Sequence, residues 1–208
     1  MGDTDMQRVG VLGGTFNPVH AGHLIMAQDA YELFDLQRVL FVPSAQPPHK
    51  PQKELLSAQH RLAMLELAVQ DDPRFEVCGI EIERGGVSYT VDTVAELRER
   101  YPGAELCFIV GSDSLAELHL WRSVLQILKL VRIVSLVRPG FDEARVRILD
   151  LGLPDPWPAR LLGDLRTGHL TGIASSDIRH RLAEGLDIRY LVPDAVAMYI
   201  AEHHLYTA

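Results

Sequence analysis

The chain has 208 residues, 47% of them hydrophobic, which is enough to bury the core of a single domain. Its 28 acidic and 20 basic side chains give a net charge of -8, which argues against a protein that binds the backbone of long nucleic acids. No apolar run approaches the ~18 residues of a membrane span, and residues 1–7, an expected flexible N-terminus, do not resemble a secretion signal. The two cysteines, Cys78 and Cys107, lack CxxC spacing and are expected to be reduced and buried. We therefore predict one cytoplasmic domain over residues 1–208, without a membrane or nucleic-acid partner.

Short apolar segments alternate with segments of helical spacing along the chain. Residues 8–13 form the first apolar run, which ends at two glycines and precedes helical spacing over 21–36. The later segments, in order, are the strand 38–44 and helix 58–70, the strand 75–82 and helix 90–101, the strand 105–113 and a helix through 121–129, and the strand 132–140. Strands that are apolar on both faces and separated by helices indicate a parallel sheet covered on both sides. We predict a doubly wound α/β fold whose ligand binds beyond the carboxyl ends of the strands.

Three segments interrupt or follow this alternation. Residues 45–57 hold three prolines and predict a surface loop. Residues 151–171 have a weak pattern that leaves room for one more strand before a helix that begins at Ser175. Pro193 is placed at a helix start, and residues 186–208 therefore predict a C-terminal helix that packs on the domain.

A glycine turn followed by two histidines, GGTFNPVHAGHL over residues 13–24, is the first motif with chemistry. Its paired glycines allow a tight turn close to a ligand, and the N-terminus of the next helix presents N–H groups to phosphate. The motif is neither a Walker loop nor the GxGxxG fingerprint. If the helix begins near Pro18 or Val19, His20 and His23 project on one side of its first turn, where they bind phosphate oxygens and stabilise a leaving group. A structural pair and a metal-binding pair remain alternatives, although no third ligand is evident nearby.

A second motif, IASSDIR over residues 173–179, also opens a helix. Ser175, Ser176 and Asp177 are ordinary N-cap residue types, so capping alone can explain them. Arg179 in the same first turn is unfavourable beside the positive end of the helix dipole unless an anion binds there. The motif therefore predicts a second contact to the same phosphate ligand.

The two motifs resemble the GGTFDPxHxGHL and ISSTxIR boxes of bacterial nicotinate mononucleotide adenylyltransferases, a family of the Rossmann-like HxGH nucleotidylyltransferases. The segments VPSAQPPHK, HRLAMLELA, SYTVDTVAELRERYP, FIVGSDSLAELHLW and LVPDAVAMYI resemble that family in the same order. HxGH and SSxxIR alone indicate the wider superfamily, whereas PPHK, SYTVDT and the tryptophan after GSDSL narrow the resemblance. Two departures are Asn17 for the usual aspartate and Ala174 for the first serine. Asn17 keeps a polar turn residue, so we expect the activity to survive.

The resemblance implies that the phosphate of nicotinate mononucleotide attacks the α-phosphorus of ATP, giving deamido-NAD and pyrophosphate. For such a transfer the protein mainly positions reactants and neutralises charge, with Mg²⁺ on the polyphosphate. The implied catalytic residues are His20, His23 and Arg179. The implied ATP-binding residues are Gly13, Gly14, Thr15, Phe16, Gly111, Asp113 and Ser176. The implied acceptor-binding residues are His49, Lys50, Thr90 and Trp121, and no residue is assigned to a protein-held metal.

Each acceptor-side role has a structural alternative. Thr90 is expected to bind the ring carboxylate, Trp121 to stack on the pyridine ring, and Lys50 to bind the mononucleotide phosphate. Without the resemblance, Trp121 would be a core residue, Lys50 a solvent-facing one, and Asp113 a helix N-cap. Three other functions remain open: an adenylyltransferase for nicotinamide mononucleotide or phosphopantetheine, a nucleotide sensor without turnover, and a metal-dependent hydrolase. The oligomeric state is also open, a homo-oligomer included.

Overall fold

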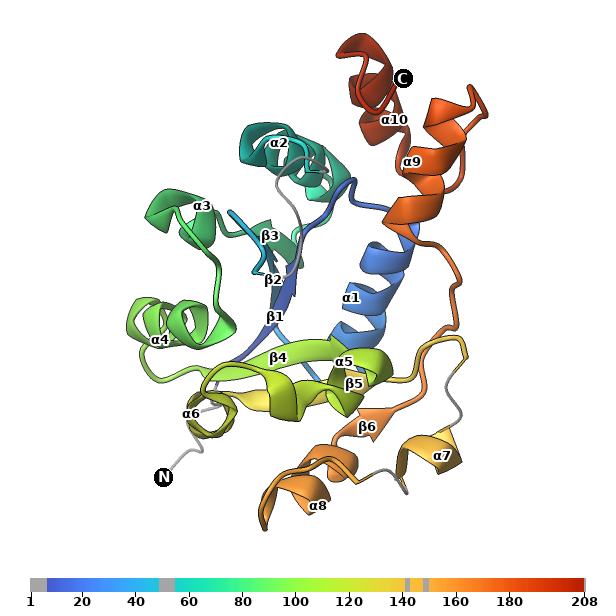
Figure 1. Ribbon diagram of the computed structural model, residues 1–208. Coiled ribbons are helices and arrows are strands. Elements are labelled where there is room, and N and C mark those ends of the chain that lie inside the picture. Colours follow the sequence, from blue (N-terminus) through green and yellow to red (C-terminus); the bar gives the residue numbers. More distant parts are fainter. Residues whose placement is uncertain (1–6, 49–54, 141–142, 148–149, 208) are drawn as a thin grey trace.

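A six-stranded parallel sheet forms the centre of the molecule (Figure 1). The computed structural model describes residues 7–48, 55–140, 143–147 and 150–207. The strands are β1 (Arg8–Gly14), β2 (Arg38–Pro43), β3 (Phe75–Val77), β4 (Glu105–Gly111), β5 (Arg132–Leu136) and β6 (Leu165–Arg166). They are hydrogen-bonded in parallel in the order β3-β2-β1-β4-β5-β6, so the order reverses beside β1. The prediction of a doubly wound α/β fold is confirmed.

Helices connect successive strands over most of the chain (Figure 1). They are α1 (Ala21–Leu33), α2 (Ala58–Val69), α3 (Ile80–Arg84), α4 (Thr90–Arg100), α5 (Ser112–Ala116), α6 (Val124–Leu130), α7 (Glu143–Arg147), α8 (Trp157–Gly163), α9 (Ser175–Ala183) and α10 (Asp194–Glu202). No helix in the described part of the chain has the length and apolarity needed to span a bilayer.

Two of the predicted elements were wrong in their extent. The strand predicted over 75–82 ends at Val77, and α3 follows it with Glu81 and Glu83 in its first turn, where carboxylates favour a helix start. The helix predicted through 121–129 begins only at Val124, because α5 and a short 3-10 helix over Leu118–Leu120 follow β4 first. Trp121 therefore lies between two helices instead of inside one.

The remaining segments agree with the sequence more closely. The additional strand expected within 151–171 is β6. The C-terminal helix is shorter than 186–208, because Pro193 is the N-cap residue of α10 and residues 186–193 precede it without helix. Residues 1–6, most of the expected flexible N-terminus, lie outside the described residues.

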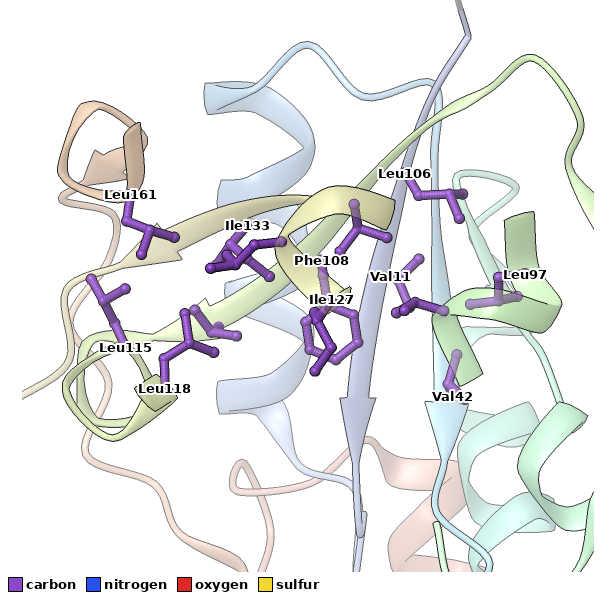
Figure 2. Packing of buried hydrophobic residues seen from close by; sticks show 14 of the residues in the cluster. Val11, Val42, Leu97, Leu106, Phe108, Leu115, Leu118, Ile127, Ile133 and Leu161 are labelled. Atoms are coloured by element: carbon purple, nitrogen blue, oxygen red, sulfur yellow. The ribbon is translucent and has the colours of Figure 1, made fainter. Parts of the chain in front are cut away.

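Two hydrophobic clusters cover the opposite faces of the sheet. One joins alternate residues of β1, β2, β4 and β5 to residues of α4, α5, α6 and α8, and Figure 2 shows Val11 and Phe108 in it beside Leu97 and Ile127. The other joins the intervening strand residues, such as Leu12, to residues of α1, α2, α9 and α10. Because side chains alternate between the faces of a strand, burial on both faces explains the nearly continuous apolar runs in the sequence.

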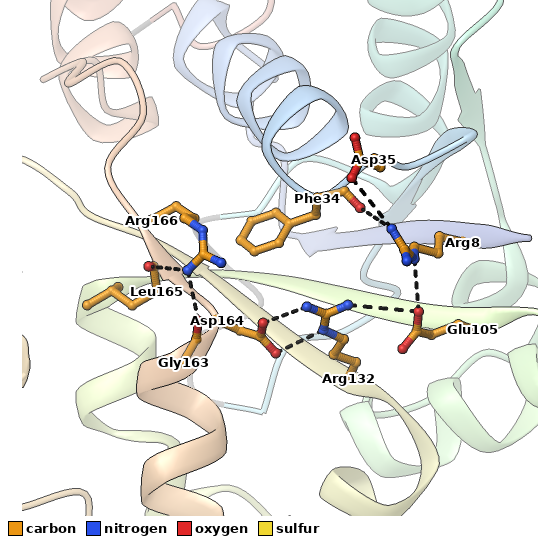
Figure 3. Close-up of polar contacts among 9 residues, drawn as sticks. All are labelled: Arg8, Phe34, Asp35, Glu105, Arg132, Gly163, Asp164, Leu165 and Arg166. Atoms are coloured by element: carbon orange, nitrogen blue, oxygen red, sulfur yellow. Dashed lines mark hydrogen bonds and ion pairs between the residues drawn. The ribbon is translucent and has the colours of Figure 1, made fainter.

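Charged side chains pair with one another at the amino ends of the central strands (Figure 3). Arg132 at the start of β5 donates two hydrogen bonds to the Asp164 carboxylate, at 2.6 and 2.9 Å. Arg8 of β1 lies 3.2 Å from Glu105 of β4 and 3.6 Å from Asp35. The hydrogen bonds that Arg132 donates to the Asp164 carboxylate raise the pKa of Arg132. Arg8 and Arg132 are therefore both neutralised by carboxylates of the chain itself.

Candidate active site

A cavity of about 280 Å³ opens at the carboxyl ends of the strands, where the strand order reverses between β1 and β4. Its walls come from the ends of β1 and β4, the segment after β2, the start of α4 and the segment after β5. Among the described residues these are Leu12, Gly13, Gly14, Thr15, His23, Met26, Ser44, Pro47, Pro48, Glu81, Ser88, Thr90, Phe108, Ile109, Val110, Gly111, Asp113, Ser114, Trp121 and Arg138. This is the position at which doubly wound sheets bind their ligands.

A second cavity of about 340 Å³ adjoins the first on the side of α4. The two cavities share Pro48, Ser88, Thr90 and Trp121, while Tyr89 and Arg122 line only the second. The Arg122 guanidinium lies 4.3 Å from the centre of the Tyr89 ring. The two spaces therefore adjoin at the wall that Thr90 and Trp121 form.

The turn after β1 is supported from below by Phe16. This residue has a left-handed backbone (φ 47) that is uncommon outside glycine, and its side chain is 1% exposed. A Cβ atom on Gly14 would lie 3.0 Å from the Phe16 ring, so a larger residue there would require the ring to shift by a few tenths of an ångström. The Phe16 ring also lies 4.9 Å from the His23 ring, edge to face. Phe16 thus fixes the turn and one imidazole, whereas Thr15 lines the cavity.

The two histidines lie against one another, as their spacing predicts, but the helix begins later than expected. Residue His20 is the N-cap of α1, with an extended backbone, and the helix starts at Ala21 instead of Pro18 or Val19. The imidazole centres are 3.7 Å apart in a stacked arrangement. The His20 backbone N–H donates to Nδ1 of His23 at 3.3 Å, which places the proton of a neutral His23 ring on Nε2. His23 lines the cavity and can therefore donate from Nε2.

His20 lies behind this wall and not in it. Its side chain is 4% exposed, and its Nδ1 has no hydrogen-bond partner among the described residues. Burial, and secondarily the charge of Arg138, lowers the pKa of His20 to about 4. The expectation that both imidazoles are exposed in a ligand cleft is wrong for His20, because the N-cap position turns its ring into the protein. His20 is neutral near pH 7.

Gly111 allows two charged side chains to approach the cavity together. A Cβ atom at this last residue of β4 would lie 2.3 Å from Oδ1 of Asp113 and 2.5 Å from Cδ of Arg138. The N-cap of α5 is Gly111, so the alternative of Asp113 as an N-cap is wrong. Sequence reasoning missed Arg138, although its position directly beyond β5 was a usable signal. Among the described residues the Arg138 guanidinium has no carboxylate within ion-pair distance.

The acceptor-side residues Thr90 and Trp121 lie on the wall that the two cavities share. Thr90 is the first residue of α4, where backbone N–H groups are without helix partners. The Trp121 ring is half-buried and lies 6.0 Å from the Phe108 ring, edge to face. Trp121 therefore packs on the core and also faces the cavities. His49 and Lys50 lie outside the described residues.

The first turn of α9 is held against the turn after β1. The Ser175 hydroxyl donates to the Pro18 carbonyl at 2.9 Å, and the Arg179 guanidinium donates to the Asn17 carbonyl at 2.9 Å. Ser176 is exposed, and neither Ser176 nor Arg179 lines the 280 Å³ cavity in the described part of the chain. The structure thus brings the two motifs together at one turn.

Asn17 is buried, and its side-chain oxygen accepts hydrogen bonds. Its Oδ1 accepts from the Tyr206 hydroxyl at 2.8 Å and from the Leu56 N–H at 3.4 Å, and the residue is 3% exposed. Burial raises the pKa of Tyr206, which keeps its hydroxyl protonated as the donor. A carboxylate oxygen would accept the same two bonds, so Asn17 and the usual aspartate are interchangeable in this contact.

No group of three His, Cys, Asp or Glu side chains with the arrangement of a metal site occurs among the described residues. Two carboxylates, Asp113 and Glu81, line the cavity. Glu81 is buried and accepts a hydrogen bond from the Thr93 hydroxyl at 2.5 Å. The described part of the cavity wall therefore offers at most two carboxylates to a divalent ion.

Known proteins share both the sequence and the fold of this chain. A family model described as cytidylyltransferase-like matches residues 11–181. A protein of Opitutus terrae named as a probable nicotinate-nucleotide adenylyltransferase is 46% identical over 96% of this chain and 97% of its own, and one of Herpetosiphon aurantiacus with the same name is 46% identical over 98% and 100%. The nicotinic acid mononucleotide adenylyltransferase of Plasmodium falciparum, solved with NaAD, has the same fold at 16% identity, with a TM-score of 0.74 over 96% of this chain and 97% of its own. The chain therefore belongs to the nicotinate-nucleotide adenylyltransferase family of cytidylyltransferase-like proteins.

Proposed function

We propose that the chain transfers the adenylyl group of ATP to nicotinate mononucleotide, which gives deamido-NAD and pyrophosphate and so contributes to NAD biosynthesis. The observation that carries the proposal is one cavity at the strand-order reversal that is lined by the glycine turn, His23, Thr90 and Trp121. The relatives of Opitutus terrae and Herpetosiphon aurantiacus, similar over nearly their whole length, support the same reaction.

The reaction is an in-line displacement at phosphorus. A phosphate oxygen of the acceptor forms a bond to the α-phosphorus of ATP, and the bond to the bridging oxygen of pyrophosphate breaks. Negative charge moves to the leaving group, so donors aimed at that group stabilise the transition state more than the ground state. No covalent intermediate on the protein is required.

On the ATP side, the assigned groups surround the turn after β1. The backbone N–H groups of Gly13–Thr15 and Nε2 of His23 donate to the phosphates, with His20 holding the His23 ring in place. Arg138 supplies a cation from the opposite wall. Ser176 and Arg179 meet the outer phosphates where α9 contacts the turn. Magnesium on the polyphosphate neutralises part of its charge.

The ribose of ATP is assigned to Gly111 and Asp113, which end β4 and open α5. A carboxylate beside a glycine at a strand end is suited to accept hydrogen bonds from ribose hydroxyls. Phe16 is assigned only its backbone, since its side chain is buried under the turn.

On the acceptor side, Thr90 and the first N–H groups of α4 bind the carboxylate of the nicotinate ring, and Trp121 stacks on the ring. The mononucleotide phosphate is assigned to Lys50, with His49 beside it. The second cavity, which shares Thr90 and Trp121 with the first, provides space for the acceptor. The cytoplasm suits this reaction, and the buried free thiols of Cys78 and Cys107 are consistent with a reducing compartment. Self-association stays a prediction.

Pyrophosphate release with ATP and a panel of acceptors tests the proposal. We expect rapid release with nicotinate mononucleotide, much slower release with nicotinamide mononucleotide and none above background with phosphopantetheine. A neutral amide leaves the donors at the start of α4 without their charged partner, which accounts for the discrimination. Comparable kcat/KM for the acid and the amide would contradict the acceptor assignment, and ATP binding without release would indicate a nucleotide sensor.

A further inference from the structure

Arg61 in α2 is a buried cation that the reaction described so far does not use. It is 1% exposed and is the one buried lysine or arginine among the described residues. No carboxylate of the described residues lies within ion-pair distance of its guanidinium. Burial lowers the pKa of Arg61, against smaller raising effects of Tyr206 and Glu81. Burying a charged guanidinium costs free energy unless its N–H donors are hydrogen-bonded. The groups that accept these hydrogen bonds therefore indicate what Arg61 does in the fold.

All three donor nitrogens of Arg61 bind backbone carbonyls. Nε donates to Leu56 at 3.1 Å, Nη1 to Thr15 at 2.8 Å, and Nη2 to Ala45 at 3.0 Å. These carbonyls belong to the turn after β1, the segment after β2 and the entry to α2, which lie 46, 16 and 5 residues from Arg61 in the sequence. Only a guanidinium has donors in a rigid planar fork that reaches three such acceptors at once.

Two of the three segments border the cavity side by side, and the Ser44 N–H donates to the Gly14 carbonyl at 2.9 Å. Thr15 lines it within the phosphate-binding turn, and Ala45 lies between the lining residues Ser44 and Pro47. The second segment is in turn bonded to the start of α4. The Ala45 N–H donates to the Ser88 hydroxyl at 2.9 Å, and the Ser88 N–H donates to the Gln46 carbonyl at 2.9 Å. The hold of Arg61 on Ala45 therefore extends to the wall that carries Thr90.

We infer that Arg61 is a positioning residue that keeps the phosphate-binding turn and the acceptor-side wall of the cavity at a fixed separation. The inference rests on the proposed adenylyl transfer. Arg61 does not line the cavity, so it acts through the two segments and not on the substrates. A displacement between two bound substrates depends on their relative placement, and a small misplacement slows the chemical step more than it weakens either binding step.

The test compares Arg61→Lys with the control Arg98→Lys. Like Arg61, Arg98 donates to a backbone carbonyl, in this case that of Ala104 alone among the described residues, at 2.8 Å. Ala104 precedes β4 and so lies at the other end of the sheet from the cavity. We expect Arg61→Lys to lower kcat by about 10- to 100-fold with much smaller changes in the KM of either substrate. Arg98→Lys should leave kcat and both KM values close to those of the unaltered chain.

A second variant separates positioning from simple loss of folding. Arg61→Ala removes the guanidinium, and kcat is measured per native molecule, counted from the stoichiometry of ATP binding in calorimetry. We expect ethylguanidinium, at concentrations too low to denature the protein, to restore part of kcat in this variant and to have no effect on Arg98→Ala. A lowered Tm with unchanged kcat per native molecule, or a raised KM with unchanged kcat, would overturn the inference and leave the proposed function intact. An unaltered chain without pyrophosphate release would instead overturn the proposed function.

Discussion

The arginines at the two ends of the parallel sheet differ in whether they are paired with carboxylates. At the amino ends, Arg8 and Arg132 are paired with Glu105 and Asp164, so the cations neutralise carboxylates of the same chain (Figure 3). At the carboxyl ends, the guanidinium of Arg138 and that of Arg179 have no carboxylate partner among the described residues, although the chain as a whole carries a net charge of -8.

This difference separates charges that serve the fold from charges that serve a ligand. Paired surface charges contribute little to stability, typically within about 1 kcal/mol. A cation that lines a cavity without an internal anion, as Arg138 does, is available to an external anion, as are the N–H groups at the start of α4. ATP supplies that anion in the proposed reaction.

His23→Ala should have the largest effect on the reaction. The change removes a side chain that lines the cavity and is assigned as a donor to the phosphates, and loss of one preorganised donor to a developing charge costs roughly 10²- to 10³-fold in kcat, about 2.7 to 4 kcal/mol. Steady-state pyrophosphate release and a thermal melt measure the effect. The exposed His203 provides the control, and His203→Ala should retain full kcat. A His23→Ala variant that keeps wild-type kcat would remove His23 from the mechanism.

His20 should affect stability through pH. Its folded pKa of about 4 lies below its ordinary value of 6.5, so the unfolded chain takes up the proton more readily. The stability is therefore complete above about pH 6.5 and is lost as the pH falls toward about 4. Between about pH 7.5 and pH 5, the wild type should lose about 2 kcal/mol more in free energy of unfolding than His20→Asn does, measured by urea unfolding. Parallel pH profiles for the two proteins would show that the His20 ring is not buried in its neutral form.

Trp121→Ala should weaken acceptor binding while ATP affinity stays nearly constant. Loss of a stacked aromatic contact corresponds to about 0.5 to 1.5 kcal/mol, or up to about tenfold in the Kd of nicotinate mononucleotide. Calorimetry with each substrate measures the two affinities. A melt accompanies it, because the ring also packs on Phe108. If ATP affinity falls and acceptor affinity does not, the two half-sites have to be exchanged.

Asp164→Asn should have the smallest effect. It breaks the paired hydrogen bonds to Arg132 at the amino ends of the strands, and we expect a loss of at most about 1 kcal/mol in the free energy of unfolding. Pyrophosphate release should be unchanged. A large loss of kcat in a variant that melts normally would mean that this end of the sheet also contributes to the reaction.

Local patterns in the sequence were sufficient to predict the parallel sheet and the glycine turn. The strands of the central sheet are apolar on both faces, and Gly13 and Gly14 mark the end of the first one in the sequence itself. The strand predicted over 75–82 was wrong because its alternating apolar residues suit both a strand and the short helix α3. Only the packing of β3 at the edge of the sheet decides between them.

The depth of individual side chains could not be predicted in the same way. Arg61 lies in HRLAMLELA, where an arginine in a helix would ordinarily face solvent, and its burial is explained by three backbone carbonyls, those of Thr15, Ala45 and Leu56. His20 and His23 are both histidines at the start of α1. His20, at the N-cap position, has a buried ring, whereas His23 lines the cavity. Such differences arise from tertiary contacts and not from spacing.

The most direct test of the account compares two arginines at opposite ends of β5. Arg138→Gln removes a cation that lines the cavity, and Arg132→Gln removes one that is paired with Asp164. Calorimetric titration with ATP should show affinity weakened by about tenfold or more in Arg138→Gln, because a charge-assisted hydrogen bond contributes about 1.5 to 3 kcal/mol. Arg132→Gln should bind ATP as the wild type does. Equal losses in the two variants, or a loss confined to Arg132→Gln, would contradict the claim that the unpaired cations at the carboxyl ends form the phosphate site.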